Sequence, residues 1–375
     1  WGAAFFLWYS EEAKRINGEI IPSSRPTQRI LVQRQPVGVV AAITPWNFPS
    51  SMITRKLAPA LAAGCTAVIK PAPETPLSAI ALFELFERAG FPAGVVNLVM
   101  GNAQEIGQEF LENDKVRKIS FTGSTQVGKN LLEQSARHVK RMSLELGGHA
   151  PYIVFPDADL EAAAEGLLYN KFQNNGQTCI CANRVFVHES IQETFAKLFV
   201  GKMAEISVGN GMEDVDVGPL IHERALAKVE RHVEDALAKG ARLAAGGRRL
   251  TEGELAKGSF YAPTVLTGVT AEMDIYREET FGPVAPFIAC RDEDEVIRMA
   301  NDTPYGLAAY FYTRDLATTM RVAERLEYGM IGINESALGY VQAPFGGVKQ
   351  SGFGREGGHH GVDGFLEYKY LNLNF

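Results

Sequence analysis

Short apolar segments rich in β-branched residues alternate with helix-length segments along most of the chain, and no other feature constrains the fold as strongly. The first of these segments lie at 37–43, 65–69, 94–99 and 116–122. A strand that is apolar throughout is buried on both faces, as in a parallel sheet covered by helices. A second series opens at 151–155 and continues with a strand at 184–188. The sequence therefore predicts an α/β fold with two doubly wound parallel sheets.

Composition argues against several classes of protein. The chain has 375 residues, enough for two or three domains, and a formal net charge of -7 without a basic cluster, so we expect no nucleic-acid binding. Its longest uncharged apolar stretches, such as 57–69, are shorter than the roughly 20 residues that span a bilayer, so we expect no membrane segment. Four cysteines in this length do not make a disulfide framework, which predicts a reducing, cytoplasmic location.

The N-terminal region departs from the alternating pattern. Residues 1–9 are apolar at helical spacing, as in a helix entered in mid-pattern, so we expect the chain to begin inside a domain. Residues 16–34 are polar and alternating, which is typical of antiparallel strands. We expect a protruding hairpin there that pairs with another subunit.

A glycine-rich segment, GSTQVGK at 123–129, follows a predicted strand and opens a helix. It nearly matches a P-loop, but Asn130 stands where Ser or Thr would hold magnesium, which disfavours a nucleotide triphosphatase. Two interpretations stay open. Either the helix N-terminus binds a phosphate group, with Ser124 as an extra donor, or the segment is a plain strand–turn–helix connection.

The segment QNNGQTCIC at 173–181 places Cys179 and Cys181 one residue apart in a polar turn. Structural zinc sites use C-x₂₋₄-C pairs, usually twice, so the sequence predicts no metal site here. A thiol in a polar loop at a possible helix start is a candidate nucleophile, although two unreactive thiols fit the pattern as well. No histidine lies in a hydrolase signature, so a carboxylate would have to act as the base. Glu145, whose apolar neighbours in LELGG should raise its pKa, is the candidate.

Seven segments resemble the NAD(P)-dependent aldehyde dehydrogenases, in that family's order and across essentially the whole chain. They are PWNFP at 45–49, KPAPETP at 70–76, FTGSTQVG at 121–128, LELGG at 144–148, GQTC at 176–179, EETFGPV at 278–284 and PFGGVKQSGFG at 344–354. The segments 50–57, 179–181 and 344–352 are most similar to succinate-semialdehyde dehydrogenases. Members of the family usually carry a further N-terminal segment, so we expect this chain to be truncated.

The resemblance implies that Cys179 is the nucleophile, that Asn47 and the Cys179 backbone N–H stabilise the oxyanion, and that Glu145 activates the water that hydrolyses a thioester. Losing one oxyanion donor typically costs about 2.7–4 kcal/mol. Relatives that transfer the acyl group to coenzyme A lack this glutamate, so a free acid product is implied. Cys181 is either a redox partner of Cys179 or a spectator thiol. A family member kept as a binding or structural protein without turnover is a remote alternative.

The resemblance also implies a cofactor, NADP or NAD. Lys70 would bind the adenosine ribose, Glu279 the nicotinamide ribose, and residues 123–128 would lie by the pyrophosphate. Trp46 either shapes the site or only packs. NAD-preferring relatives have a glutamate where this chain has Pro73, so we expect NADP to be accepted at least as well as NAD. The implied cofactor-binding residues are Thr44, Trp46, Lys70, Pro73, Gly123, Ser124, Gly128, Glu279 and Phe281, the last of these flanking the nicotinamide.

Two positions bear on the substrate. Arg55 matches the position at which succinate-semialdehyde dehydrogenases hold the substrate carboxylate, but a surface or salt-bridged arginine is an equal alternative. The second arginine of that pattern is Gln173 here, so the resemblance implies a weaker carboxylate clamp and a wider tolerance. We expect a small semialdehyde such as succinate semialdehyde, with a broad-specificity or another semialdehyde dehydrogenase as the alternative.

For the whole chain, the resemblance implies an NAD(P)-binding domain at 1–15 and 35–147 and a catalytic domain at 148–350. Residues 16–34 and 365–375 would form a protruding β oligomerisation element of a homodimer or homotetramer. The expected partner is a small aldehyde, without nucleic acid or membrane.

Overall fold

The chain forms two compact units in the computed structural model, which describes all residues from Trp1 to Phe375. Unit 1 comprises Trp1–Leu146, Gly339–Gly346 and Gly352–Phe375, and unit 2 comprises Gly147–Leu338 and Gly347–Ser351. The catalytic domain predicted at 148–350 differs from unit 2 at residues 339–346, which belong to unit 1. The Trp1 indole Nε1 donates a hydrogen bond to the Gly339 carbonyl at 2.8 Å there, a contact between residues far apart in the sequence.

Unit 1 is built on a six-stranded sheet in the order β17-β7-β6-β3-β4-β5. Every neighbouring pair is parallel except β17–β7. The chain runs outward from β3 through β4 and β5 and then returns to the other side of β3, which is the predicted doubly wound topology. The strands are β3 (Val39–Ile43), β4 (Thr66–Lys70), β5 (Val96–Leu98), β6 (Val116–Thr122), β7 (Arg141–Glu145) and β17 (Gly352–Phe353).

Helices of unit 1 begin at residues suited to a helix N-terminus. Pro49 and Pro76 open α2 and α3, where no N–H partner is needed. The side chains of Asn102 and Ser124 accept hydrogen bonds from the first turns of α4 and α5. The helices are α1 (Gly2–Glu12), α2 (Pro49–Ala62), α3 (Pro76–Arg88), α4 (Ala103–Glu112), α5 (Thr125–Ser135) and α12 (His360–Asp363), with 3₁₀ turns η1 (Ala13–Arg15) and η2 (Ala136–His138).

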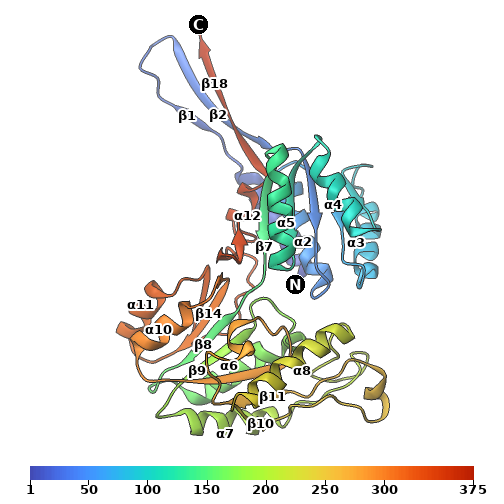
Figure 1. Ribbon diagram of the computed structural model, residues 1–375. Coiled ribbons are helices and arrows are strands. Elements are labelled where there is room, and N and C mark those ends of the chain that lie inside the picture. Colours follow the sequence, from blue (N-terminus) through green and yellow to red (C-terminus); the bar gives the residue numbers. More distant parts are fainter. The chain divides into compact units, whose positions relative to one another are not determined.

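The predicted antiparallel element is present in unit 1. β1 (Glu19–Ile21) pairs with β2 (Gln28–Pro36), and β18 (Leu366–Asn374) pairs with the other side of β2 along its whole length. In Figure 1 this sheet extends away from the helices of its unit, with the C-terminus at its tip. Apolar side chains such as Ile20 and Tyr368 are exposed on it. Exposed strand edges are templates for pairing, and a second subunit as the partner stays a prediction.

Unit 2 contains a seven-stranded sheet in the order β10-β11-β12-β9-β8-β14-β15, parallel except for β10–β11. The chain runs from β8 toward β12 and returns to the other side of β8 with β14, so this sheet is doubly wound as well. A further antiparallel pair joins β13 to β16. The strands are β8 (Ala150–Val154), β9 (Ala182–His188), β10 (Arg242–Ala245), β11 (Thr264–Thr267), β12 (Val284–Cys290), β13 (Tyr305–Gly306), β14 (Ala308–Tyr312), β15 (Met330–Ile333) and β16 (Val348–Lys349).

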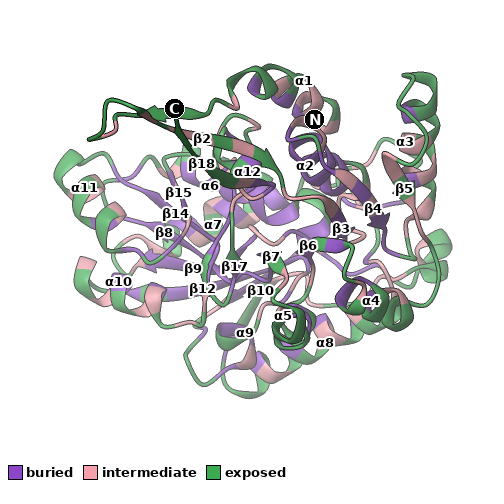
Figure 2. Cartoon of the chain, turned by 90° about the horizontal axis from the view of Figure 1, so that it is seen from above, coloured by how far each residue is buried: buried purple, intermediate pink, exposed green.

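Aspartates cap three helices of unit 2, because Asp159, Asp292 and Asp315 accept hydrogen bonds from the first turns of α6, α10 and α11. The central strands of the sheet are buried, whereas the outer faces of α10 and α11 are exposed (Figure 2). None of the chain's helices combines the length and apolar composition that crossing a bilayer requires. The helices are α6 (Leu160–Phe172), α7 (Gln192–Met203), α8 (Glu223–Ala238), α9 (Asp274–Arg277), α10 (Glu293–Asn301) and α11 (Leu316–Arg325), with 3₁₀ turns η3 (Gln173–Gly176) and η4 (Gly253–Lys257).

Candidate active site

In unit 1, several predicted cofactor-binding residues gather at the carboxyl edge of the sheet. Thr44 directly follows β3, Gly123 directly follows β6, and Lys70 is the last residue of β4. Because Ile43 is paired with both Lys70 and Phe121, these three strand ends lie side by side. In an open parallel sheet, ligands bind outside the carboxyl ends of the strands where the strand order reverses, and β3 and β6 form that point here.

This edge carries polar groups that need partners. The hydroxyls of Thr44 and Thr122 are buried, yet neither Oγ1 has a hydrogen-bond partner. Ser124 caps the N-terminus of α5 nearby, directly after Gly123 in the chain. Unpaired buried hydroxyls are unfavourable, and a helix N-terminus favours phosphate, so a dinucleotide fits this edge. Trp46 and Asn47 follow in the partly buried loop that leads from Thr44 into α2.

Two glycines of unit 1 allow close approaches around Glu145. A Cβ on Gly128 would lie 2.4 Å from the Cδ2 atom of Leu146, so this glycine lets α5 pack against the residue after Glu145. A Cβ on Gly346, whose φ is +157°, would lie 2.8 Å from Glu145 Oε1. The structure thus gives Gly128 a packing reason, beside the cofactor role that stays a prediction.

Glu145 ends β7 and is buried among charged groups. Burial and the neighbouring Glu356 raise the pKa of Glu145, and Arg55 and Lys56 oppose that shift without cancelling it. Its Oε2 atom has no hydrogen-bond partner. The direction of the shift confirms the expectation from the sequence, but its causes include a second carboxylate, which the apolar neighbours in LELGG did not indicate.

Arg55 and Lys56 of α2 share the carboxylate of Glu356. The Arg55 Nε atom lies 2.8 Å from Oε2, the Lys56 Nζ atom lies 2.5 Å from Oε1, and all three side chains are buried. The Arg55 guanidinium also lies 4.1 Å from the centroid of the Phe345 ring. The structure therefore shows the salt-bridged alternative for Arg55, and binding of a substrate carboxylate stays a prediction.

Lys70 keeps donors available at the end of β4. Its Nζ atom donates a hydrogen bond to the Pro71 carbonyl at 3.2 Å, and an ammonium group has three donors. Burial lowers the pKa of Lys70, and the nearby Glu74 opposes that shift. Pro73 and Glu74 are exposed in the loop between β4 and α3. A ribose or phosphate group is a suitable acceptor for the remaining donors.

In unit 2, predicted site residues gather at the amino ends of neighbouring parallel strands. Cys179 precedes β9, Glu279 and Phe281 precede β12, and Gly148 precedes β8. A Cβ on Gly148 would lie 2.3 Å from the Cys179 carbonyl oxygen, so only glycine fits there. The Gly148 N–H also donates a hydrogen bond to Glu279 Oε1 at 3.1 Å. Gly148 therefore links the segments that carry Cys179 and Glu279.

The expectation that Cys179 lies at a helix start is wrong. The 3₁₀ turn η3 (Gln173–Gly176) ends before Cys179, and the chain then enters β9 at Ala182. Asn174 and Asn175 have left-handed conformations, with φ of 49° and 57°, which a continuing helix cannot accommodate. Cys179 therefore lies partly buried in a turn that leads into a strand.

Helix α8 holds the loop that carries Glu279 and Phe281. The Lys228 ammonium donates a hydrogen bond to the Glu279 carbonyl, and Phe281 has a φ of 56°. Burial raises the pKa of Glu279 to about 7, although the Gly148 N–H and nearby lysines lower it. Glu279 therefore changes charge near neutral pH.

Glu278, the residue before it, is anchored to the same helix. The Arg231 guanidinium donates to Glu278 Oε2 at 2.8 Å, and the His232 ring lies 3.1 Å from the same oxygen. Sequence reasoning missed Lys228, Arg231 and His232, because their helix is far from the EETFGPV segment along the chain. No local signal reveals such partners.

Two further predicted residues differ in exposure. Cys181 is completely buried, and burial raises the pKa of its thiol, which favours the spectator interpretation over a reactive thiol. Gln173 is exposed, and its amide donates a hydrogen bond to the Tyr169 hydroxyl at 3.3 Å. The structure does not place Gln173 in a charged cluster.

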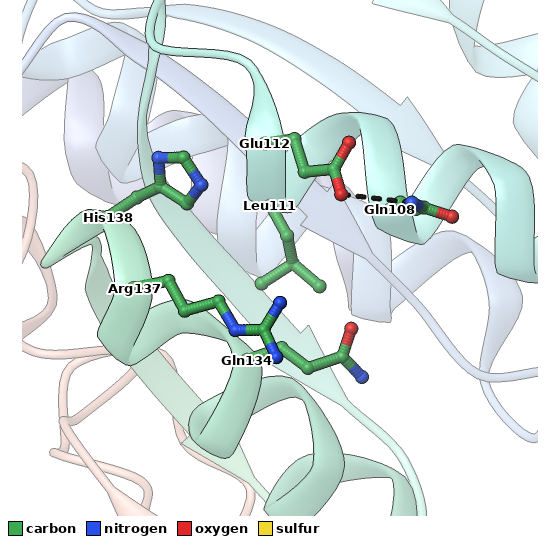
Figure 3. A pocket seen from close by; sticks show the side chains of 6 residues that line it. All are labelled: Gln108, Leu111, Glu112, Gln134, Arg137 and His138. Carbon is green, nitrogen blue, oxygen red and sulfur yellow. Dashed lines mark hydrogen bonds between the residues drawn. The ribbon is translucent and has the colours of Figure 1, made fainter.

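A surface depression of about 270 Å³ in unit 1 is lined by none of the predicted site residues (Figure 3). Its lining comes from α4, α5 and η2, and the Gln108 amide donates to the Glu112 carboxylate at 2.9 Å. Glu112 and Arg137 bring opposite charges to it, so it has no clear preference for one kind of ion. The lining residues are Gln108, Leu111, Glu112, Gln134, Arg137 and His138.

Comparison with known proteins decides the family. The sequence profile described as "Aldehyde dehydrogenase family" matches residues 2–371. The chain belongs to the aldehyde dehydrogenase family. It is 53% identical over 375 residues to the glutarate-semialdehyde dehydrogenase of Pseudomonas putida, covering 100% of this chain and 77% of that protein. It is also 53% identical over 372 residues to the succinate-semialdehyde dehydrogenase [NADP(+)] GabD of Escherichia coli, covering 99% and 76%.

Solved structures agree with this assignment. The crystal structure of an aldehyde dehydrogenase from Brucella melitensis biovar abortus 2308 superposes with a TM-score of 0.97 at 55% identity, covering 100% of this chain and 76% of that one. The predicted aldehyde dehydrogenase-like α/β fold is therefore confirmed. As an aldehyde dehydrogenase, the protein is an oxidoreductase that acts on aldehydes with NAD or NADP.

Proposed function

We propose that this aldehyde dehydrogenase oxidises a small semialdehyde, an aldehyde with a carboxylate at its far end, to the corresponding dicarboxylate. The observation that carries the proposal is the balance of charge around α2. While Glu145 is protonated, Arg55 and Lys56 face one ionised carboxylate, that of Glu356. A surplus positive charge of this kind favours an anionic substrate. The relatives named above act on glutarate semialdehyde and succinate semialdehyde, which both end in a carboxylate.

Cys179 is proposed as the nucleophile of this reaction. Its thiolate adds to the aldehyde carbon, and the amide of Asn47 together with the Cys179 N–H stabilises the resulting oxyanion of the thiohemiacetal. The cofactor, when bound, supplies the hydride acceptor, so that the thiohemiacetal carbon is oxidised to a thioester. Gly148 supports the geometry, because its missing side chain lets the Cys179 carbonyl lie close to it.

Glu145 is proposed as the base of the second half of the reaction. Its carboxylate takes a proton from water as the water oxygen attacks the thioester carbon, and collapse of the tetrahedral intermediate expels the Cys179 thiolate. The product is a free acid. Since burial raises the pKa of Glu145, this step should become faster as the pH rises through that pKa.

NADP is proposed to serve at least as well as NAD. Pro73 offers neither charge nor acceptor side chain, while the Lys70 ammonium keeps donors for a 2′-phosphate. The exposed Glu74 opposes this preference. The ratio of kcat/KM for the two cofactors tests it, and a ratio far in favour of NAD would contradict it.

Assembly and location are proposed on similar grounds. The exposed three-stranded sheet of β1, β2 and β18 is proposed to pair with a second copy of the chain, giving a homodimer or homotetramer. Four free cysteines are consistent with a reducing, cytoplasmic location.

The test compares kcat/KM for succinate semialdehyde, glutarate semialdehyde and butyraldehyde in the wild type, Arg55→Gln and Arg55→Lys. If Arg55 contributes the charge that binds the carboxylate, Arg55→Gln should lose about 10- to 100-fold for the semialdehydes and much less for butyraldehyde. Arg55→Lys should recover part of the loss. Equal losses for all three aldehydes would reassign Arg55 to structure, and a wild-type preference for butyraldehyde would overturn the substrate class.

A further inference from the structure

Lys171 is completely buried in the last turn of α6, yet it has no carboxylate partner. Its Nζ atom donates hydrogen bonds to the Ala182 carbonyl at 2.8 Å and to Asn183 Oδ1 at 3.2 Å, and both acceptors are neutral. An unpaired ammonium in a protein interior is unfavourable, because its hydration is lost without a counter-ion. Both acceptors lie at the start of β9, just after the turn that carries Cys179.

The same short segment is held by two more side chains. Asn170, the neighbour of Lys171 on α6, accepts a hydrogen bond from the Ala182 N–H at 2.7 Å. The Tyr310 hydroxyl donates to the Ile180 carbonyl at 2.8 Å. Consecutive residues of one helix thus bind the N–H and the carbonyl of Ala182, which determines where the chain passes between Cys179 and β9.

The backbone before this segment is equally constrained. The Cys181 N–H donates to the Thr178 carbonyl at 3.0 Å, closing the turn around Cys179. The Cys179 carbonyl is packed so closely against Gly148 that no side chain fits at that position. The position of the Cys179 thiol therefore depends on the side chains that bind its turn and the segment after it. Of Lys171, Asn170 and Tyr310, only Lys171 carries a charge.

The charge of Lys171 shifts the pKa values of titratable groups around the turn. It lowers the pKa of Cys181 in the turn, of Glu279 in the loop before β12, and of His149 before β8. For Cys181 and Glu279 this effect opposes the larger effect of burial. A fixed positive charge favours anions in its surroundings, and a thiolate is one of them.

We propose that Lys171 is a positioning residue for Cys179: its ammonium group holds the backbone that follows the nucleophile and places a fixed positive charge behind the turn, where it favours the thiolate. The proposal rests on the proposed function, in which Cys179 is the nucleophile. The two contributions are separable by substitution. Glutamine retains a donor without the charge, arginine retains the charge with a different reach, and methionine retains neither.

The experiment uses the full chain as wild type, Lys171→Arg, Lys171→Gln and Lys171→Met. The rate at which iodoacetamide alkylates Cys179 is measured against pH, with mass spectrometry of the peptide to separate Cys179 from Cys181. In Lys171→Gln we expect the profile to move to higher pH by about 0.5–1 unit, which slows alkylation near pH 7 by about 3- to 10-fold. Lys171→Arg should keep the wild-type profile, and Lys171→Met should also slow hydride transfer in the first turnover beyond Lys171→Gln.

A matched control separates these effects from loss of stability. Val296→Ala removes a buried side chain of the same unit in α10 and should lower the melting temperature without moving the alkylation profile. Identical profiles in the wild type, Lys171→Arg and Lys171→Gln would overturn the role of Lys171 while leaving Cys179 as the nucleophile. The variant Cys179→Ser tests the proposed function separately, since oxidation at the wild-type rate in that variant would overturn the nucleophile itself.

Discussion

Two pairs of buried cations, one pair in each unit, are held in different ways. In unit 1, Arg55 and Lys56 both face the carboxylate of Glu356. In unit 2, Lys171 and Arg184 are buried at least as deeply but meet neutral oxygens. The acceptors of the Arg184 guanidinium are the carbonyls of His149, Met299 and Ala300 and the hydroxyl of Tyr328.

This difference separates two uses of buried charge. A cation that faces a carboxylate belongs to a set of titratable groups, so protons and anionic ligands can redistribute among them. A cation that binds carbonyl oxygens instead determines the path of the main chain. Arg184 does so at the C-terminus of α10, where the helix dipole also favours positive charge. We infer that the group of Arg55, Lys56 and Glu356 in unit 1 is arranged for changes of charge, whereas Lys171 and Arg184 in unit 2 fix the positions of main-chain segments.

The largest expected effect comes from removing the carboxylate of Glu145, which lies among Glu356, Arg55 and Lys56 in unit 1. Glu145→Gln should reduce steady-state turnover by about 10²- to 10⁴-fold, because a base is lost. A burst of hydride transfer in the first turnover should remain, since a thioester accumulates when hydrolysis alone is impaired. Rapid-mixing measurements check both. Loss of the burst together with turnover would show that Glu145 acts before hydride transfer.

The same variant should not lose stability. The folded-state pKa of Glu145 is raised, so its contribution to stability is present below the unfolded-state pKa and is lost as the pH rises through the folded-state value. Glutamine cannot ionise, and Glu145→Gln should therefore be at least as stable as the wild type at pH 8. Urea unfolding of the wild type and the variant at pH 5 and pH 8 measures this. A Glu145→Gln variant that is less stable than the wild type at pH 8 would contradict the assigned direction.

Glu356→Gln should break the pairing in unit 1. It leaves Arg55 and Lys56 buried without an ionised partner, which typically costs about 3–5 kcal/mol in the free energy of unfolding. The second substitution Lys56→Met should recover part of that loss, because one of the stranded charges is removed. Chemical denaturation of the single and double variants measures whether part of the loss is recovered. Strictly additive losses would mean that Glu356 and Lys56 are not coupled.

Arg184→Lys should have a smaller effect in unit 2. Lysine keeps the charge but has three donors where arginine has five, so at least one buried carbonyl loses its partner. The expected cost is about 1–3 kcal/mol in the free energy of unfolding. Arg248→Lys, at an exposed position, is the control and should be neutral. A neutral Arg184→Lys would show that the charge, and not the set of donors, is what unit 2 uses.

The smallest expected effect concerns Glu279, a buried carboxylate of unit 2 that accepts a hydrogen bond from a backbone N–H. Its pKa of about 7 means that it gains a proton as the pH falls below neutrality. A carboxylate accepts hydrogen bonds from ribose hydroxyls better than a neutral acid does, so KM for the cofactor should rise about threefold between pH 8 and pH 6. Glu279→Gln should flatten this dependence, and an unchanged profile in that variant would assign the titration to another group.

Much of the fold follows from local patterns. Segments such as 151–155 are apolar on both faces and become buried parallel strands, as predicted, because only such a sheet covers both faces. Capping residues such as Ser124 and Asp159 begin helices where the pattern changes. The sequence motifs likewise identified Cys179, Glu145 and Asn47 as candidate catalytic residues, and their roles stay predictions.

The sequence by itself determined many of the elements, the two doubly wound sheets and the family, because apolar patterning, helix capping and short motifs are properties of neighbouring residues. Only the tertiary structure decided that Glu356 pairs with Arg55, that Cys179 lies in a turn before a strand, and that Lys171 binds that turn. These features depend on burial and on distances between residues far apart in the chain. Desolvation and charge pairing act through space, and the spacing of residues along a sequence does not encode such distances.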